Sequence, residues 1–344
     1  MTASQAPEPT GRDLTEKVAF LRQPQAYRGK AVEVAAIETH MSWVFLAGRI
    51  AYKLKKPVQN DFLDFRGLES RRRNCGDEVR LNRRLAPDVY LGTVPLTVEA
   101  DGTLAVDGAG DPVDWLVKMR RLPAERMLDQ AIRDGTAKTR ELRTVARLLA
   151  TFFADAVPVA MPPAEYRRRL ASAVTANRRI LADPASGMPI RPVEIVTAML
   201  RKFVMGQTPL FDRRVRRGRI REGHGDLRAE HVFLGPKAAV IDCLEFSRDS
   251  RIQDSADELS RLAIECEVLG GPGAGKVILE TCCDRLGDDP PPELIAFYKA
   301  FRAMLRAGAA ILIPANGSPG VPAHAQGRAE TYLTLAELYA RQLG

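Results

Sequence analysis

The chain has 344 residues, and 51 Lys and Arg against 43 Asp and Glu give it a formal net charge of +8 at pH 7. At about 150 residues per domain, this length predicts two domains or one domain with two lobes. The hydrophobic fraction of 45% and the charged fraction of 27% are typical of a globular protein that buries a sizeable core without a disulfide or metal.

Several classes of protein are excluded at this stage. Residues 1–9 contain no apolar core, so we expect no secretory signal. No run of about 18 apolar residues occurs, so we expect no membrane-spanning helix. Five cysteines without a C-x-x-C pair indicate reduced thiols in a cytoplasmic protein. The positive charge permits nucleic acid, an anionic surface or a phosphate-bearing ligand, and its alternative explanation is an Arg-rich proteome.

The N-terminal third of the chain has a β-rich pattern. Residues 1–12 are polar and Pro-rich, which predicts disorder. The predicted strands are 32–37, 43–46, 50–54, 90–98 and 114–119, with a hairpin at 101–102, and the predicted helices are 14–21 and 68–85. These elements predict a small β-rich N-lobe over residues 13–120.

Residues 121–344 are predicted to form a larger, mostly helical C-lobe. The predicted helices are 139–156, 164–181, 192–204, 248–268, 292–313 and 328–343. One β-rich interruption is expected at 223–246. The fold class predicted from this order is α+β, with two lobes of unequal size.

The clearest chemical signal comes from His224-Gly225-Asp226, His231 and Ile241-Asp242. A hairpin in this region would place Asp226, His231 and Asp242 near one another. Phosphoryl transfer needs one carboxylate to orient the attacking hydroxyl and accept its proton, and a second one, with a nearby ligand, to hold magnesium. Magnesium prefers oxygen ligands, which Asp242 supplies. An isolated H-G-D is more often a turn with an Asp cap, so the interpretation depends on Asp242 as well.

These motifs resemble the aminoglycoside phosphotransferase and choline kinase branch of the protein-kinase-like fold. Ile50-Ala51-Tyr52-Lys53 resembles the V-A-I-K strand, whose lysine steadies the α- and β-phosphates. Glu78 resembles the helical glutamate that pairs with this lysine. Residues 115–123 resemble the inter-lobe hinge that receives adenine, and residues 254–259 resemble the D-P-x-x-D-L-A segment. The likeness covers residues 14–310.

The chain is also similar to a bacterial subgroup of uncharacterised phosphotransferases, through residues 38–46 and 52–58. Some members carry an added P-loop domain, which we expect to be absent here. The resemblance implies an ATP-dependent phosphotransferase with an alcohol group as acceptor, with Mg²⁺ or Mn²⁺ as its metal. The acceptor is expected to be a small molecule with a hydroxyl group.

The resemblance also implies a role for each site residue. The catalytic residues would be Asp226 and His224, and the metal ligands would be Asp242 and His231. The nucleotide-binding residues would be Lys53, Glu78, Ser42, Thr39, Met119, Arg120 and Leu122. Glu245 and Asp257 are expected to support loop geometry.

Two departures from the family pattern affect the phosphate and metal sites. Position 231 is His where the wider family has Asn, and an imidazole is a softer ligand that favours manganese more. The loop over residues 38–42 has no glycine, so phosphates would be held by backbone N–H groups and by the hydroxyls of Thr39 and Ser42. A plain hairpin is the alternative for this loop.

Three nearby lysines compete for the phosphate-binding role. Period-two alternation places Lys53 and Lys55 on the same face of a strand, whereas Lys56 points away. Lys53 is the predicted phosphate-binding lysine, with Lys55 in reserve. Lys55 and Lys56 are more simply explained as a solvated basic edge that discourages strand pairing.

Two further features are predicted to be structural. Residues 270–277 fit G-x-x-x-x-G-K, but Val277 replaces the Ser or Thr of a P-loop, so we predict a loop between helices and no nucleotide site. The Arg-rich runs at 71–73, 167–169 and 213–221 are typical of solvated helix faces. The alternative for the run at 213–221 is attraction of an anionic acceptor.

Two alternatives to an active kinase remain open. One is a nucleotide-binding regulatory pseudokinase, which His231 and the glycine-free loop would favour. The other is a basic nucleic-acid-binding protein, whose affinity would fall steeply with salt. Aromatic residues are not interleaved in the basic runs, so nucleic-acid binding is disfavoured. Aminoglycosides are polycations, and no acidic pocket is apparent for them.

Overall fold

The computed structural model describes residues 12–27, 33–60, 63–312 and 322–344. The chain divides into two compact units, Met1–Ala124 with Ala239–Arg248, and Glu125–Ala238 with Asp249–Gly344. Residues 239–248 were predicted to belong to the helical C-lobe, whereas the structure groups them with the β-rich unit. The predicted disorder of residues 1–12 lies outside the described residues except at Arg12, whose Nη2 donates to the carbonyl O of Gly102 at 2.5 Å.

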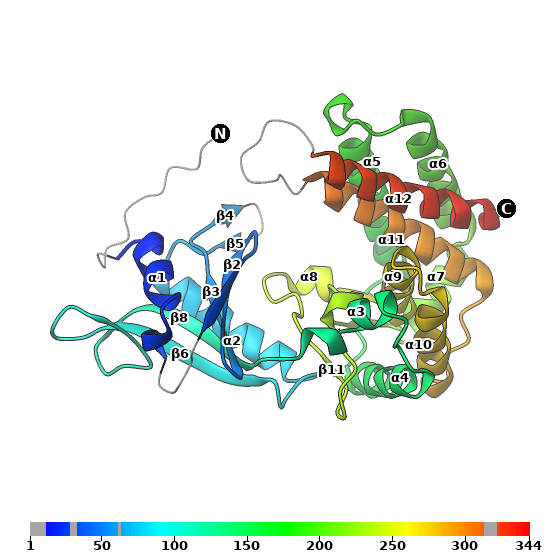
Figure 1. Ribbon diagram of the computed structural model, residues 1–344. Coiled ribbons are helices and arrows are strands. Elements are labelled where there is room, and N and C mark those ends of the chain that lie inside the picture. The colour runs from blue at the N-terminus through cyan, green and yellow to red at the C-terminus, as the bar shows by residue number, and fades with distance from the viewer. Residues whose placement is uncertain (1–11, 28–32, 61–62, 313–321) are drawn as a thin grey trace. The chain divides into compact units, whose positions relative to one another are not determined.

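The first unit is built on a curled antiparallel sheet (Figure 1). Among its described residues, six strands follow the order β1-β2-β3-β8-β6-β7. Their bounds are β1 Val34–Glu38, β2 Ser42–Ala47, β3 Ile50–Lys55, β6 Tyr90–Val98, β7 Leu104–Val106 and β8 Asp111–Arg120, and a short pair is formed by β4 Gln59–Asn60 and β5 Leu63–Asp64. Alternation along the strands buries Phe45, Leu54, Leu96 and Leu116 completely. The five strands predicted for this part match β1, β2, β3, β6 and β8 within a few residues.

Two helices complete the described part of the first unit, α1 (Leu14–Leu21) and α2 (Leu68–Asn82). Helix α2 packs against β6 and β8. Asp114 of β8 joins both helices to the sheet, because it accepts from Lys17 Nζ at 2.9 Å and from Arg71 Nε at 2.8 Å. The prediction of a solvated face at 71–73 is therefore wrong for Arg71, which is fully buried.

The second unit is mostly helical. Its described helices are α3 Leu128–Arg133, α4 Thr139–Asp155, α5 Pro163–Leu181, α6 Ile190–Gly206, α7 Thr208–Arg216, α8 Arg248–Arg251, α9 Ser255–Val268, α10 Pro272–Arg285, α11 Pro292–Leu312 and α12 Ala323–Ala340. Short strands are β9 Ile220–Glu222, β10 Val232–Phe233 and β12 Ile252–Asp254, while β11 Ala239–Val240 belongs to the first unit. The core of the second unit is lined by aromatic rings, including Phe203 and Phe297, which stack at 5.0 Å between centroids. Helices α4, α5, α6, α11 and α12 were predicted with small shifts of their ends, and α3, α7 and α10 were not predicted.

The helix predicted over 248–268 is interrupted. Strand β12 pairs in antiparallel fashion with β9, with Gln253 opposite Arg221. Asp254 then caps α9, because its carboxylate accepts the N–H of Ala256 at 2.9 Å. The pairing of β12 with β9 and the Asp254 cap therefore interrupt the single helix that the spacing of apolar residues had predicted.

The glycine-rich segment 270–277 is mostly helical. Leu269 and Gly270 form a turn, Gly271 is the N-cap of α10, and α10 begins at Pro272, so the prediction of a loop is wrong for residues 272–277. A Cβ at Gly275 would lie 2.7 Å from Cα of Ala263, which shows that this glycine permits close packing of α10 against α9. The segment follows a helix, in contrast to a P-loop, which follows a buried strand.

Three arginines of the run at 213–221 form hydrogen bonds inside the second unit. Arg214 is 4% exposed and forms two-pronged bonds to Asp254 and Asp288, with distances from 2.5 to 2.7 Å. Arg219 Nη2 donates to the carbonyl O of Gly287 at 2.8 Å, and Arg221 Nη1 to that of Ala156 at 2.8 Å. The prediction of a solvated face is wrong for Arg214, whereas Arg213, Arg216 and Arg217 are exposed as predicted.

All five cysteines lie in the described part of the chain, where each is buried and free of disulfide bonds. Burial raises the pKa of Cys75 and Cys266 to about 12, so these thiols stay protonated. None of the helices in the described ranges combines the length and the apolar character that a membrane crossing requires.

Substituting Arg214→Met is expected to lower the free energy of unfolding by about 3–5 kcal/mol, because it leaves two buried carboxylates without their partner. Chemical denaturation followed by circular dichroism measures this change. Arg213→Met is the matched control, since Arg213 is exposed on the same helix, and it should stay within about 0.5 kcal/mol of wild type. Equal stability of the two variants would contradict this account of Arg214.

Candidate active site

In the first unit, one buried carboxylate is shared by two lysines. Glu78 of α2 is completely buried, and its Oε1 accepts from Lys53 Nζ at 3.0 Å. Its other oxygen, Oε2, contacts Lys55 Nζ. Alternation along β3 places both lysines on the same face, as predicted. Burial would raise the pKa of Glu78, but the charges of Lys53 and Lys55 hold it below its ordinary value, so Glu78 stays ionised.

Residues 239–248 bring two more acids to these lysines. Asp242 Oδ1 lies 2.7 Å from Lys53 Nζ, and Glu245 Oε1 lies 2.6 Å from Lys55 Nζ. Burial would lower the pKa of Lys53, but Asp242 and Glu78 hold it well above its ordinary value, so the ammonium persists. The interpretation of Lys55 as a solvated edge residue is wrong, because its side chain is only 1% exposed.

The backbone around Asp242 is held in an uncommon conformation. Asp242 has φ 61°, in the left-handed region that Asp adopts more readily than most residues. Its N–H donates to the hydroxyl of Tyr90 at 3.1 Å, and the N–H of Cys243 donates to Oδ1 of Asn82 at 2.8 Å. Side chains of the sheet and of α2 therefore set the direction of the Asp242 carboxylate, whose side chain is 44% exposed.

The loop between β1 and β2 is closed by bonds within itself. Thr39 Oγ1 donates to the carbonyl O of Ser42 at 2.9 Å and accepts the N–H of Ser42 at 3.0 Å. The Ser42 hydroxyl is buried and has no hydrogen-bond partner among the described residues. The geometry therefore favours the plain hairpin over a phosphate cradle built from these two hydroxyls.

The three predicted hinge residues differ in the pairing and hydrogen bonding of their backbones. Met119 pairs with Ala51 and Tyr90 inside the sheet. The N–H of Arg120 donates to the carbonyl O of Val89 at 2.8 Å, so this donor is already used. Leu122 follows the end of β8 in a partly exposed position.

In the second unit, the H-G-D segment is anchored by Glu258 of α9. This fully buried carboxylate accepts the N–H of His224 at 2.9 Å and the N–H of Gly225 at 2.5 Å. Gly223 makes room for it, because a Cβ there would lie 2.0 Å from Glu258 Oε2. Loop support was predicted for Asp257 instead, but Asp257 pairs with Arg302 of α11. The signal for Glu258 was present in the acidic pair that follows the Asp254 cap.

Asp226 is surrounded by basic side chains. Arg261 of α9 contacts Oδ1, while Arg228 Nη1 lies 3.6 Å and His231 Nδ1 lies 3.9 Å from Oδ2. Burial would raise the pKa of Asp226, but Arg261, His231 and Arg228 lower it to about 2. His224 is completely buried, and its Nδ1 accepts the N–H of Asp226 at 3.3 Å. This contact makes His224 a support for the backbone of Asp226.

His231 has a defined tautomer when it is neutral. Its Nδ1 lies 2.8 Å from the main-chain O of Asp226, and because a carbonyl only accepts, Nδ1 carries the proton. The lone pair is then on Nε2, the nitrogen that would coordinate a metal.

Magnesium is commonly bound by one or two carboxylates together with substrate phosphates, so the exposed Asp242 carboxylate fits it. Within the described ranges, no group of three or more His, Cys, Asp or Glu forms a complete metal site.

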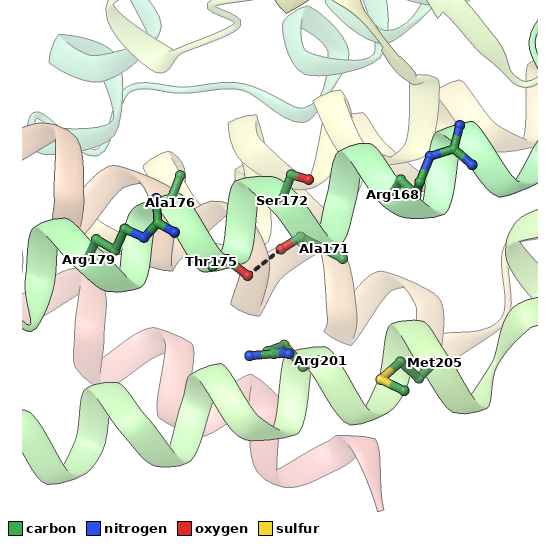
Figure 2. Close-up of a pocket in the computed structure, with 8 residues that line it drawn as sticks. All are labelled: Arg168, Ala171, Ser172, Thr175, Ala176, Arg179, Arg201 and Met205. Atoms are coloured by element: carbon green, nitrogen blue, oxygen red, sulfur yellow. Dashed lines mark hydrogen bonds between the residues drawn. The ribbon is translucent and has the colours of Figure 1, made fainter.

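A separate groove lies between α5 and α6 of the second unit, with a volume of about 510 Å³ (Figure 2). Figure 2 shows Arg168 and Arg179 on α5 and Arg201 on α6 along this groove. None of the three arginines forms an ion pair with another described residue. No predicted site residue lines the groove, so it is distinct from the candidate active site.

The chain has relatives among known protein sequences. No protein-family model matches the chain. Over 294 residues, or 84% of its length, the chain is 35% identical to uncharacterised proteins of Mycobacterium tuberculosis and Mycobacterium bovis. It spans only 57% of the length of these curated relatives.

Two solved structures share the architecture over nearly the whole chain. A choline/ethanolamine kinase family protein from Mesorhizobium loti has a TM-score of 0.56 at 16% identity and covers 96% of this chain and 99% of its own. Choline kinase from Cryptosporidium parvum has a TM-score of 0.56 at 10% identity and covers 95% of this chain and 96% of its own. The chain therefore has the protein-kinase-like fold of these kinases, with a β-rich N-lobe and a helical C-lobe. The predicted fold class and the resemblance that implied it are confirmed.

Gly223→Ala is expected to lower the free energy of unfolding by about 1–3 kcal/mol, because it displaces Glu258 and leaves two buried N–H groups without an acceptor. Urea denaturation measures the change. The matched control is Gly327→Ala on α12, where a Cβ meets nothing within 4 Å. Removing this helical glycine should raise stability by about 0.5–1 kcal/mol, and a similar gain at Gly223 would contradict the packing described here.

Proposed function

We propose that the protein is an ATP-dependent phosphotransferase that moves the γ-phosphate to a hydroxyl group of a small molecule. The observation that carries this proposal is the position of Lys53 between the buried Glu78 and the exposed Asp242. A lysine held by a helical glutamate is suited to the α- and β-phosphates, and the adjacent carboxylate is suited to the metal that bridges them. The kinase fold raises the expectation of this chemistry but does not by itself establish it.

In this proposal the first unit binds the nucleotide. Lys53 binds phosphate oxygens while Glu78 keeps its ammonium in place, and the backbone near Met119 and Leu122 receives adenine. Asp242 would supply a carboxylate to Mg²⁺, which would neutralise charge on the phosphates when bound. His231 is proposed as a further ligand, because its neutral form has the lone pair on Nε2. The imidazole makes Mn²⁺ an acceptable substitute. Five buried thiols that form no disulfide bond support a reducing compartment such as the cytoplasm.

Asp226 is the proposed group that contacts the acceptor hydroxyl. Its carboxylate accepts the hydrogen bond of the hydroxyl and takes its proton as the hydroxyl oxygen bonds to the γ-phosphorus. The bond from the γ-phosphorus to the β–γ bridging oxygen breaks in the same step, and ADP leaves. The pKa of about 2 makes Asp226 a weak base, so its main contribution is to orient the hydroxyl. This suffices for a loose transition state, in which little proton transfer is required early. His224 holds the Asp226 backbone and does not itself react.

The charges near Asp226 favour an anionic acceptor. Arg261, Arg228 and Arg306 all act on the Asp226 carboxylate as positive neighbours. An acceptor that carries a carboxylate or phosphate beside its hydroxyl would bind to these guanidinium groups, whereas a cationic alcohol would meet like charge. The structural neighbours named for choline and ethanolamine act on cations, so this chain would differ from them in acceptor charge.

A regulatory pseudokinase is the second candidate, and a specific observation favours it. The β1–β2 turn has no glycine and uses the Thr39 hydroxyl for its own closure, so one phosphate-holding element is weak. Such a protein would bind MgATP and transfer no phosphate.

Asp226→Asn is expected to reduce phosphate transfer by about 10²–10⁴-fold, because it removes the group that orients and deprotonates the hydroxyl. Labelled-phosphate transfer to a metabolite pool gives the rate, and calorimetry gives MgATP affinity, which should stay within about twofold of wild type. Full activity in the variant would refute the role of Asp226. MgATP binding without transfer in the wild type would instead identify the pseudokinase.

The acceptor charge is tested with three small alcohols, glycerate, glycerol and choline. We expect kcat/KM to decrease in that order, because guanidinium groups near Asp226 attract the anion and repel the cation. High salt should reduce the advantage of glycerate over glycerol, since mobile ions screen these charges. A preference for choline at low salt would contradict the proposed anionic acceptor.

A further inference from the structure

The proposed chemistry leaves Lys55 and Glu245 without a role, although both are well buried. The side chain of Lys55 is 1% exposed and that of Glu245 is 9% exposed. Their Nζ and Oε1 atoms lie 2.6 Å apart. Long charged side chains are seldom buried to this extent unless another group needs their charge.

Glu78 is the group that needs the charge of Lys55. Its carboxylate is completely buried, with Lys53 on Oε1 and Lys55 on Oε2. When Lys53 bonds to a phosphate, its hold on Glu78 weakens, and a buried carboxylate with no partner is strongly disfavoured. Lys55 remains on the other oxygen, so Glu78 keeps a compensating charge throughout.

Glu245 connects the same lysine to Asp242. It lies three residues beyond Asp242 in the segment that the first unit holds through Tyr90 and Asn82. Asp242 is bonded to Lys53 in the structure, at 2.7 Å, and would lose this contact when Lys53 moves to a phosphate. The bond between Lys55 and Glu245 does not involve Lys53, so it still fixes the segment after that exchange.

We propose that Lys55 is a positioning residue of the nucleotide site, an inference that rests on the proposed function. Lys53 exchanges Asp242 for phosphate, while Lys55 stays in place and performs two tasks. It compensates the negative charge of the ionised Glu78, and through Glu245 it holds Asp242 where a metal can be bound. The site therefore uses two lysines, one that exchanges partners and one that does not.

The two tasks predict different effects on nucleotide binding, which calorimetry measures with MgATP and with ATP in excess EDTA. Lys55→Met should weaken both forms, MgATP by about tenfold or more, because it removes a support of the metal ligand as well as the partner of Glu78. Glu245→Gln should weaken MgATP by a similar factor but leave metal-free ATP within about twofold of wild type. A merely structural role would weaken both forms together in both variants.

The control is Lys56→Met, one residue further along the chain. Lys56 Nζ pairs with Glu38 Oε1 at 2.6 Å, away from Glu78. This variant should bind both forms of ATP as wild type does. If Lys55→Met fails to fold, Glu245→Gln still decides the matter, because it leaves the pair between Lys55 and Glu78 intact.

The outcomes separate this inference from the proposed function. A wild-type protein that binds neither form of ATP overturns both. A wild-type protein that binds MgATP keeps the proposed function, and the inference then fails if Glu245→Gln matches Lys56→Met. The inference also fails if Glu245→Gln weakens MgATP and metal-free ATP equally.

Discussion

The first unit depends on one constraint, the ionised Glu78 carboxylate in a fully buried position. A charge without water must be matched by opposite charge and hydrogen bonds, and here two lysines on one strand face supply both. This requirement links β3 to α2, since the alternation of β3 must direct Lys53 and Lys55 to the same side. It also explains why residues 239–248 belong to the first unit, because each lysine takes one further acid from that segment.

The part of this arrangement that could be predicted is the part with a local pattern. Alternation along β3 was enough to place Lys53 and Lys55 on one face. The burial of Lys55 could not be predicted in the same way. The interpretation of Lys55 as a solvated edge residue assumed that β3 had no neighbouring strand on one side. The structure places β3 between β2 and β8, so neither side of the strand is an edge. Strand order is a non-local property, and the sequence of one strand does not contain it.

The same limit applies to the second unit. Arg214 belongs to a run that is typical of a solvated helix face, yet its partners Asp254 and Asp288 are 40 and 74 residues away. Helical spacing over 248–268 was real for α9 but could not reveal that residues 252–254 pair with β9. Loop support was predicted for Asp257, and only the packing against Gly223 shows that its neighbour Glu258 supports the H-G-D segment. Motifs thus identified the candidate site residues, while their supporting contacts required the fold.

The two units satisfy their reactive groups in the same manner. Lys53 is bonded to carboxylates, and Asp226 is bonded to a guanidinium, so neither is left as a bare buried charge. In the proposed mechanism, nucleotide binding replaces one charged partner of Lys53 by another, a phosphate for Asp242, whereas Asp226 keeps Arg261 on Oδ1. Such an exchange costs less than exposing a new charge, because the desolvation has already occurred during folding. In the proposed mechanism, Lys55 of the first unit and Glu258 of the second keep their partners. They therefore determine how well the neighbouring site residues keep their positions while Lys53 changes partner.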